Sequence, residues 1–105
     1  MKKRAALFTK QAESDIIGIY EYIAFTLLSP DTALIQVRRI RHSIENLSNM
    51  PKRYPIYDKK PWIDRELRRM NVDNFVVFYV YDDDERQVTI IRVLYSRRNI
   101  DDILP

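Results

Sequence analysis

The sequence predicts an α+β fold in which two neighbouring helices cover one face of a largely antiparallel sheet of about four strands. Over residues 10–47, apolar residues recur at spacings of three or four, which indicates amphipathic helices. The later part of the chain concentrates β-branched and aromatic residues, which favour strands. Helices in one run and strands in another are typical of α+β domains. With 105 residues, 46% of them hydrophobic, the chain is expected to form one domain, residues 1–105.

The first half of the chain is expected to form a short strand and then an antiparallel hairpin of two helices. The strand is "RAALFT", residues 4–9, and Thr9 offers a hydroxyl for a helix N-cap. Pro30 suits the first position of the second helix, with Ser29 as its cap. Each helix carries one apolar stripe. The first stripe is Ala12, Ile16, Ile19, Ile23 and Leu27, and the second is Leu34, Val37, Ile40, Ile44 and Leu47.

The second half is expected to form three strands and a short C-terminal helix. The strands are "RELRRMNV", "FVVFYVY" and "QVTIIRVLY", and they are separated by an Asp73–Asn74 turn and an acidic run at residues 82–85. The middle strand is apolar throughout, as suits a central strand packed on both faces. The preceding segment contains three prolines and should be irregular, anchored by Tyr54, Tyr57 and Trp62. Residues 96–104 should form the helix, capped by Ser96 or Asn99.

Composition excludes several classes of site. One glycine cannot build a glycine-rich phosphate loop or a dinucleotide fingerprint. Without cysteine there is no disulfide, thiolate metal site or cysteine nucleophile, and a single histidine, His42, cannot make a multi-histidine metal site. The sequence therefore predicts neither a metal nor a cofactor.

No apolar run approaches the roughly 20 residues that a membrane-spanning helix needs. The apolar stretch near the N-terminus is too short for the core of a signal peptide. A cytoplasmic location is expected.

Positive charge is concentrated in the middle of the chain. Residues 38–69 contain ten Lys or Arg and four Asp or Glu, a balance of +6, so the other residues carry −3 of the total of +3. This asymmetry favours an anionic partner, either nucleic acid or an acidic protein segment. For any single residue in that segment, a solvated helix face is the simpler explanation.

Arg92 lies in the middle of the last long strand, where a lone buried charge would be prohibitively costly. If side chains alternate strictly along the strand, Arg92 points to the same face as Val88, Ile90 and Leu94. It then either faces the side of the sheet that no helix covers, or forms an ion pair with Glu66 or a residue of the first helix. In the first case the uncovered face would be a shallow basic surface that also holds Arg68 or Arg69, with Arg97 and Arg98 just past the end of the strand.

The chain resembles the RelE/ParE superfamily of bacterial type II toxins over nearly its whole length. The matching stretches are "QAESDIIGIYEYIA", "SPDTALIQVRRIRHSIENLSNMPKRYP" and "ELRRMNVDNFVVFYVYDDDERQVTIIRVLYSRRNIDDIL". The ending "IIRVLYSRRNIDDIL" is similar to the ParE branch, in which a basic pair and a short apolar C-terminal helix follow the last strand. The resemblance implies a toxin of a plasmid-stabilisation (addiction) system with a cognate antitoxin.

Two activities divide this superfamily. RelE-like members cleave mRNA on the ribosome with a basic set and a C-terminal Tyr or His, whereas ParE-like members poison DNA gyrase. The chain departs from the nuclease pattern because Val76 stands where those members carry an arginine. "RELRRM" replaces their paired lysines, and the chain ends at Pro105 without a terminal aromatic residue. The resemblance therefore favours gyrase inhibition by binding, neutralised by an antitoxin.

The alternative is a ribosome-dependent mRNA endonuclease, or mRNA interferase. RNA cleavage needs an acid, a base and charge stabilisation at the phosphate. Arginines could supply the charge, but a general base is hard to find among His42, Tyr79, Asp101 and Asp102. A degenerate toxin that binds antitoxin without toxicity is a third possibility. The residues expected to bind the target or the antitoxin, or to serve the nuclease, are Arg68, Arg69, Arg92, Tyr95, Arg97 and Arg98.

Overall fold

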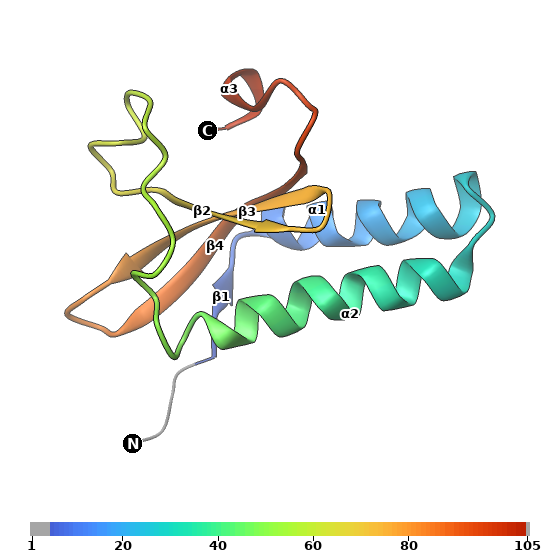
Figure 1. Ribbon diagram of the computed structural model, residues 1–105, viewed down its shortest axis with the longest axis horizontal. Coiled ribbons are helices and arrows are strands. Elements are labelled where there is room, and N and C mark those ends of the chain that lie inside the picture. The colour runs from blue at the N-terminus through green and yellow to red at the C-terminus, as the bar shows by residue number, and fades with distance from the viewer. Residues whose placement is uncertain (1–4, 105) are drawn as a thin grey trace.

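The computed structural model describes residues 5–104 and has the predicted α+β fold. Helices α1 and α2 lie on one side of a four-stranded sheet, and a long loop and the C-terminal segment lie on the other (Figure 1). The strand order is β1–β4–β3–β2, with β1 parallel to β4 and the other pairs antiparallel. The elements in chain order are β1 (Leu7–Phe8), α1 (Lys10–Glu21), the π-helix η1 (Tyr22–Thr26), α2 (Pro30–Asn46), β2 (Arg68–Val72), β3 (Phe75–Asp82), β4 (Gln87–Tyr95) and α3 (Ile100–Ile103).

The first core lies between the helical hairpin and the sheet. α1 begins where the Thr9 hydroxyl accepts a hydrogen bond from the Ala12 amide at 3.0 Å, which confirms the predicted cap. Burying each large apolar side chain stabilises the fold by about 1.5–3 kcal/mol, so this core fixes the hairpin on the sheet. Its buried members are Ala12, Ile16, Ile40, Ile44, Leu47, Met70, Val72, Val77, Tyr79, Val88, Ile90 and Val93.

A second core covers the opposite face of the sheet, and the prediction of an open basic face is wrong. The loop before β2 and the segment after β4 lie across this side (Figure 1). They bury the side chains that β3 directs away from the helices, because a strand that is apolar on both faces needs cover on both. The members are Tyr57, Trp62, Leu67, Val76, Phe78, Leu94 and Leu104.

A β-bulge in β4 breaks the strict alternation expected around Arg92. Phe78 pairs with Arg92, but the next residue of β3, Tyr79, pairs with Ile90, so Ile91 is extra. Val88 and Ile90 therefore face the first core, whereas Arg92 and Leu94 lie on the face of the second core. The predicted grouping of these four residues on one face is wrong. The extra residue, Ile91, exchanges the two faces toward which alternate side chains of β4 point.

The far end of the helical hairpin is more exposed than its apolar stripes predict. α1 ends at Glu21 and continues as η1, and Leu27 and Leu34 are 52% and 42% exposed. The helical hairpin extends beyond the end of the sheet, so the sheet does not cover its far end (Figure 1). Leu28, in the connection, is 81% exposed and has a positive φ of 54°.

Several predicted boundaries also differ. β2 begins at Arg68 and not at Arg65, because the preceding residues turn to place Trp62 and Leu67 in the second core. The predicted first strand is shorter, at Leu7–Phe8, and its first residue, Arg4, is outside the described residues. The Ser29 hydroxyl donates to the Leu27 carbonyl and does not cap α2, although Ser29 does occupy the N-cap position.

The C-terminal helix is a single turn preceded by Asn99 at its N-cap position. The Asn99 side-chain amide donates to Asp102 and makes no capping bond to the backbone. Ser96 instead donates its backbone N–H to the Asn74 carbonyl at 2.8 Å. The helix is therefore held by its contacts with the sheet and the loop more than by a cap.

Candidate functional site

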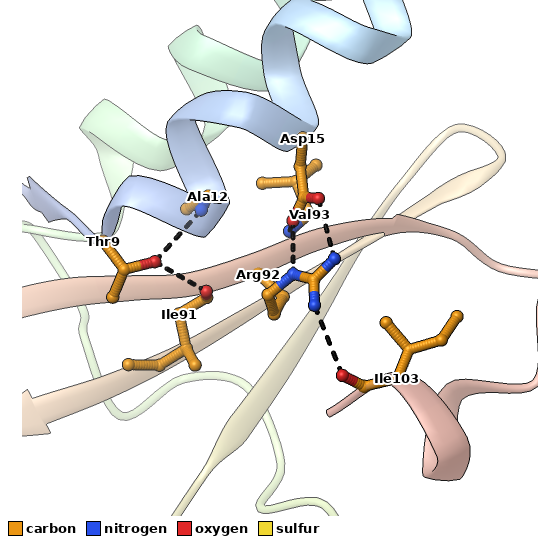
Figure 2. Close-up of polar contacts among 7 residues, drawn as sticks. All are labelled: Thr9, Ala12, Asp15, Ile91, Arg92, Val93 and Ile103. Atoms are coloured by element: carbon orange, nitrogen blue, oxygen red, sulfur yellow. Dashed lines mark hydrogen bonds and ion pairs between the residues drawn. The ribbon is translucent and has the colours of Figure 1, made fainter. Parts of the chain in front are cut away.

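Arg92 forms an ion pair with Asp15 of α1 at the edge of the sheet (Figure 2). Its Nε and one terminal nitrogen donate to the two Asp15 oxygens at 2.7 and 2.9 Å, and the other terminal nitrogen donates to the Ile103 carbonyl at 3.3 Å. Asp15 also accepts the Val93 backbone N–H at 2.9 Å. The two side chains are only 14% and 13% exposed, so Arg92 joins α1, β4 and the C-terminal segment. Of the two alternatives that the sequence left open, the ion pair with the first helix is present.

The edge of β4 is closed at this position by side chains and not by another strand. β1 pairs with β4 only at Thr89 and Ile90. At the next residue of β4, the Thr9 hydroxyl donates to the Ile91 carbonyl at 2.8 Å (Figure 2). Two residues later, the Asp15 carboxylate accepts a hydrogen bond from the Val93 backbone N–H. The start of α1 thus satisfies backbone groups that an edge strand would leave open. Asp15 is the residue that sequence reasoning did not name, because it is 77 positions from Arg92.

The two arginines of β2 point to different faces of the sheet. Arg68 pairs with Tyr79 and donates to the backbone carbonyls of Tyr54, at 2.7 Å, and Lys52. Arg69 pairs with Phe78, so it shares the second-core face with Arg92, about 10 Å away across β3. The Arg69 guanidinium lies over the Tyr57 ring, 5.5 Å from its centre.

We call the sheet side covered by residues 56–67 and 96–104 the loop face. Cations there lie over its buried aromatic rings: Arg65 is 5.4 Å from the centre of the Trp62 ring, and Lys59 is 5.9 Å from that of Tyr57. Such contacts stabilise by about 0.5–1 kcal/mol each at exposed sites. The sequence analysis did not include Lys59 and Arg65 in this face. In residues 57–65 each cation follows an aromatic residue, Tyr57 or Trp62, by two or three positions, and this spacing could have indicated them.

Arg97, Arg98 and Tyr95 lie together at the exit of β4. All three are exposed, and the Tyr95 ring lies 5.9 Å from the Phe75 ring. Within residues 5–104, the side chains of Arg97 and Arg98 make no ion pair. The structure therefore separates the predicted set: Arg68 and Arg92 bond within the protein, whereas Arg97 and Arg98 face solvent.

Three groups that could serve as a general base or acid, Tyr79 on the helix face and Tyr57 and Asp101 at the loop face, have pKa values shifted away from neutrality. Burial raises the pKa of Tyr79 to about 12, and its hydroxyl donates to the Pro51 carbonyl at 2.7 Å. Burial, and a hydrogen bond to Asp101, also raise the pKa of Tyr57. Bonds from Lys59 and Tyr57 lower the pKa of Asp101, which makes that carboxylate a weaker base.

Histidine chemistry is also absent from the loop face within the described part of the chain. His42 is exposed on α2, and α2 packs on the opposite face of the sheet. Residues 5–104 contain no group of three or more His, Cys, Asp or Glu side chains that could hold a metal ion. None of the helices in these residues is long and apolar enough to cross a bilayer.

Comparisons with known proteins agree with this geometry. A family model described as ParE toxin of type II toxin-antitoxin system, parDE, matches residues 6–100. A solved structure described as the chromosomal ParDE TA system from P. aeruginosa has a TM-score of 0.70 at 18% sequence identity, covering 89% of this chain and 96% of that chain. At this identity the second match shows a shared fold. A search of curated proteins found no match. The family match, over nearly the whole chain, shows that this protein belongs to the ParE toxin family of type II toxin-antitoxin systems.

Proposed function

We propose that this protein inhibits DNA gyrase by binding it, and that a cognate antitoxin neutralises this activity in the cytoplasm. Membership of the ParE family supports a toxin, and the departures from the nuclease pattern, such as Val76, support binding over RNA cleavage. The observation that carries the proposal is the state of the candidate acid–base groups, Tyr57 and Asp101 at the loop face and Tyr79 on the helix face of the sheet. The raised pKa values keep Tyr57 and Tyr79 neutral, and the lowered pKa of Asp101 makes its carboxylate a weaker base, which supports binding over general acid–base catalysis.

The exposed arginines give the loop face its role in binding. Arg97 and Arg98 are exposed and make no ion pair within residues 5–104, so they can meet carboxylates or phosphates, and Arg69 is half-buried on the loop face. Arginine forms paired hydrogen bonds with either anion. Contact with gyrase through Arg97 and Arg98, with Tyr95 beside them, is therefore proposed, while Arg68 and Arg92 contribute by holding the backbone in place.

Purified protein added to purified gyrase and supercoiled plasmid tests the activity. The expected result is less supercoiling together with an accumulation of linear, gyrase-cleaved DNA. Translation extracts given the same protein should keep intact mRNA. Cleaved transcripts with normal gyrase activity would instead establish the endonuclease alternative.

Charge reversal tests the surface. The double variant Arg97→Glu/Arg98→Glu should lose gyrase inhibition at least ~10-fold while its unfolding midpoint stays close to that of the wild type, because both side chains are exposed. The matched control is Lys10→Glu/Arg38→Glu, which changes the net charge equally at exposed positions on α1 and α2. Equal inhibition by the two double variants would remove Arg97 and Arg98 from the proposed interface.

A further inference from the structure

The positive charge in the middle of the chain lies outside the proposed gyrase interface. That interface belongs to the loop face, whereas α2 packs on the opposite side of the sheet (Figure 1). Residues 38–53, which include the C-terminal half of α2 and the turn after it, contain five Lys or Arg and one acidic residue, Glu45. The net charge of this stretch, five minus one, is +4, and all six charged side chains are exposed.

Most of these cations have no partner within the fold. Two of the five are paired, Arg39 with Asp73 and Lys52 with Asp83. Within residues 5–104, no hydrogen bond or ion pair uses the other three guanidinium groups, which are those of Arg38, Arg41 and Arg53. Each of these groups therefore offers up to five N–H donors to an acceptor outside the protein.

Exposed neutral side chains add hydrogen-bonding groups to the same side of α2. Arg38 and Arg41 are three residues apart, which places them on one face of the helix. Asn46, Asn49 and Arg53 line one small cavity of about 190 Å³, so the turn after α2 brings Arg53 beside the end of the helix. We call these exposed side chains the α2 stripe: Arg38, Arg41, His42, Asn46, Asn49 and Arg53.

The composition of the α2 stripe fits the backbone of a nucleic acid better than a protein surface. Protein–protein interfaces have a core that is rich in apolar and aromatic side chains, and the stripe contains none. Protein–DNA interfaces are polar and positively charged, and Arg and Asn donate many of their hydrogen bonds to phosphate and sugar oxygens. The acidic run at residues 82–85 limits the stripe at one end, where Lys52 pairs with Asp83. A bound phosphate backbone would therefore run along α2 and away from this turn.

The aromatic rings next to the stripe are covered by its own arginines. The Arg41 guanidinium lies over the Phe8 ring, 5.9 Å from its centre, and Arg53 lies over the Tyr54 ring at 5.6 Å. Both rings are only partly exposed. Proteins that bind single-stranded nucleic acid stack the bases on exposed aromatic rings. The stripe lacks such a platform, which favours a duplex, because its bases are already stacked and its phosphates lie outside.

We propose that the α2 stripe binds the sugar–phosphate backbone of duplex DNA. The guanidinium groups of Arg38, Arg41 and Arg53 donate to phosphate oxygens, and the amides of Asn46 and Asn49 supply further hydrogen bonds. The contact is independent of base sequence, because phosphates carry no sequence information. The inference goes beyond the proposed function and does not rest on it, since the two surfaces lie on opposite sides of the sheet. A toxin held on DNA in this way keeps its loop face open to the enzyme that works on that DNA.

Fluorescence anisotropy of a short labelled DNA duplex, titrated with the purified full-length protein in the absence of gyrase, tests the proposal. The wild type should bind with a Kd of about 10⁻⁶–10⁻⁴ M at physiological salt and more tightly at low salt. The triple variant Arg38→Gln/Arg41→Gln/Arg53→Gln should raise Kd at least ~10-fold at low salt. It should also lower the slope of log Kd against log salt concentration by about 2–3, because three phosphate contacts are lost. Its unfolding midpoint should stay close to that of the wild type, since all three side chains are exposed.

The matched control is Lys60→Gln/Arg97→Gln/Arg98→Gln, which removes the same charge from exposed positions of the loop face. Its affinity for the duplex should stay close to that of the wild type. Equal losses in the two triple variants would overturn the proposal, by showing that net charge alone attracts DNA.

Three other results would also overturn the proposal. They are no binding by the wild type at low salt, tighter binding to single-stranded DNA or to an RNA duplex, and competition by polyglutamate as effective as that by unlabelled DNA. All of these results leave the proposed function standing, because gyrase is absent from the measurement. Conversely, a protein that binds DNA through the α2 stripe but fails to inhibit gyrase would contradict the proposed function alone.

Discussion

Arg92 shows how one charged residue can be accommodated in the middle of a strand. Its guanidinium pairs with Asp15 and reaches the Ile103 carbonyl, so it connects both layers that cover the sheet. A buried ion pair is weak evidence for net stabilisation, because both charges lose solvation. Its loss is nevertheless costly, since removal of one partner leaves the other charge buried without compensation.

The variant Asp15→Ala should therefore lower the free energy of unfolding by about 3–5 kcal/mol. It leaves Arg92 unpaired at 14% exposure and also removes the acceptor of the Val93 N–H. Urea denaturation followed by circular dichroism measures the change. The control is Arg39→Ala, which removes an exposed partner of Asp73 and should cost at most about 1 kcal/mol. Equal losses in the two variants would contradict a structural role that depends on burial.

Tyr79 should make stability sensitive to alkaline pH. Its pKa in the folded protein is about 12, above the ordinary value of 10, so the folded state favours the neutral phenol. This contribution is complete below about pH 10 and is lost as the pH rises toward 12. Tyr79→Phe should therefore lose less stability than the wild type between about pH 8 and about pH 11. Urea midpoints at the two pH values measure it, and Tyr22→Phe, at an exposed tyrosine, should behave as the wild type.

At the scale of elements, α3 is the least autonomous part of the fold. One helical turn cannot be stable alone, because nucleation of a helix is unfavourable. Three contacts hold it: Leu104 in the second core, the bond from Arg92 to Ile103, and Asp101 bonded to both Tyr57 and Lys59. Since α3 covers part of the loop face, its docking also shapes the surface proposed to bind gyrase.

Acid should loosen α3 before the rest of the protein. The pKa of Asp101 is lowered by hydrogen bonds from Lys59 and Tyr57, so its contribution is present above about pH 4 and lost as the pH falls through the lowered value. Amide hydrogen exchange of residues 100–104 should accelerate in acid relative to the amides of β3. In Asp101→Asn the exchange of α3 should already be faster at neutral pH and change less with acid. Unchanged protection in that variant would show that the apolar contacts alone hold α3.

At the scale of the whole molecule, two cores share one central strand. β3 directs Val77 and Tyr79 toward the helices, and Val76 and Phe78 toward the loop face, and all four are buried. Neither core can lose its β3 side chains without moving the backbone that supports the other. The described part of the chain should therefore unfold as one cooperative unit.

This coupling predicts coincident transitions. Trp62 fluorescence reports on the second core and far-ultraviolet circular dichroism reports mainly on the helices, and both should give one urea midpoint. Phe78→Ala in the second core should cost about 3–5 kcal/mol and Ile40→Ala in the first about 2–5 kcal/mol. Each variant should lower the urea midpoint measured by fluorescence and the one measured by circular dichroism by the same amount. A shift of the fluorescence alone in Phe78→Ala would mean that the second core unfolds independently.

The sequence by itself determined the order of the elements, the cap at Thr9 and the turn at Asp73, because these depend on periodicity and on neighbours a few residues apart. It also determined the family, through motifs spread over the chain. It could not determine the ends of the helical stripes, since Leu27 and Leu34 fit the apolar pattern yet are largely exposed.

Only the tertiary structure decided which arginines remain available. Arg92 forms an ion pair with Asp15, 77 positions away in the sequence, and Arg68 donates to the Tyr54 carbonyl. Arg97 and Arg98 are exposed to solvent. A bulge that reverses the phase of β4 and a proline-rich loop that buries Trp62 produce this result. Both depend on contacts between distant segments, and such contacts leave no periodic signal in the residues that make them.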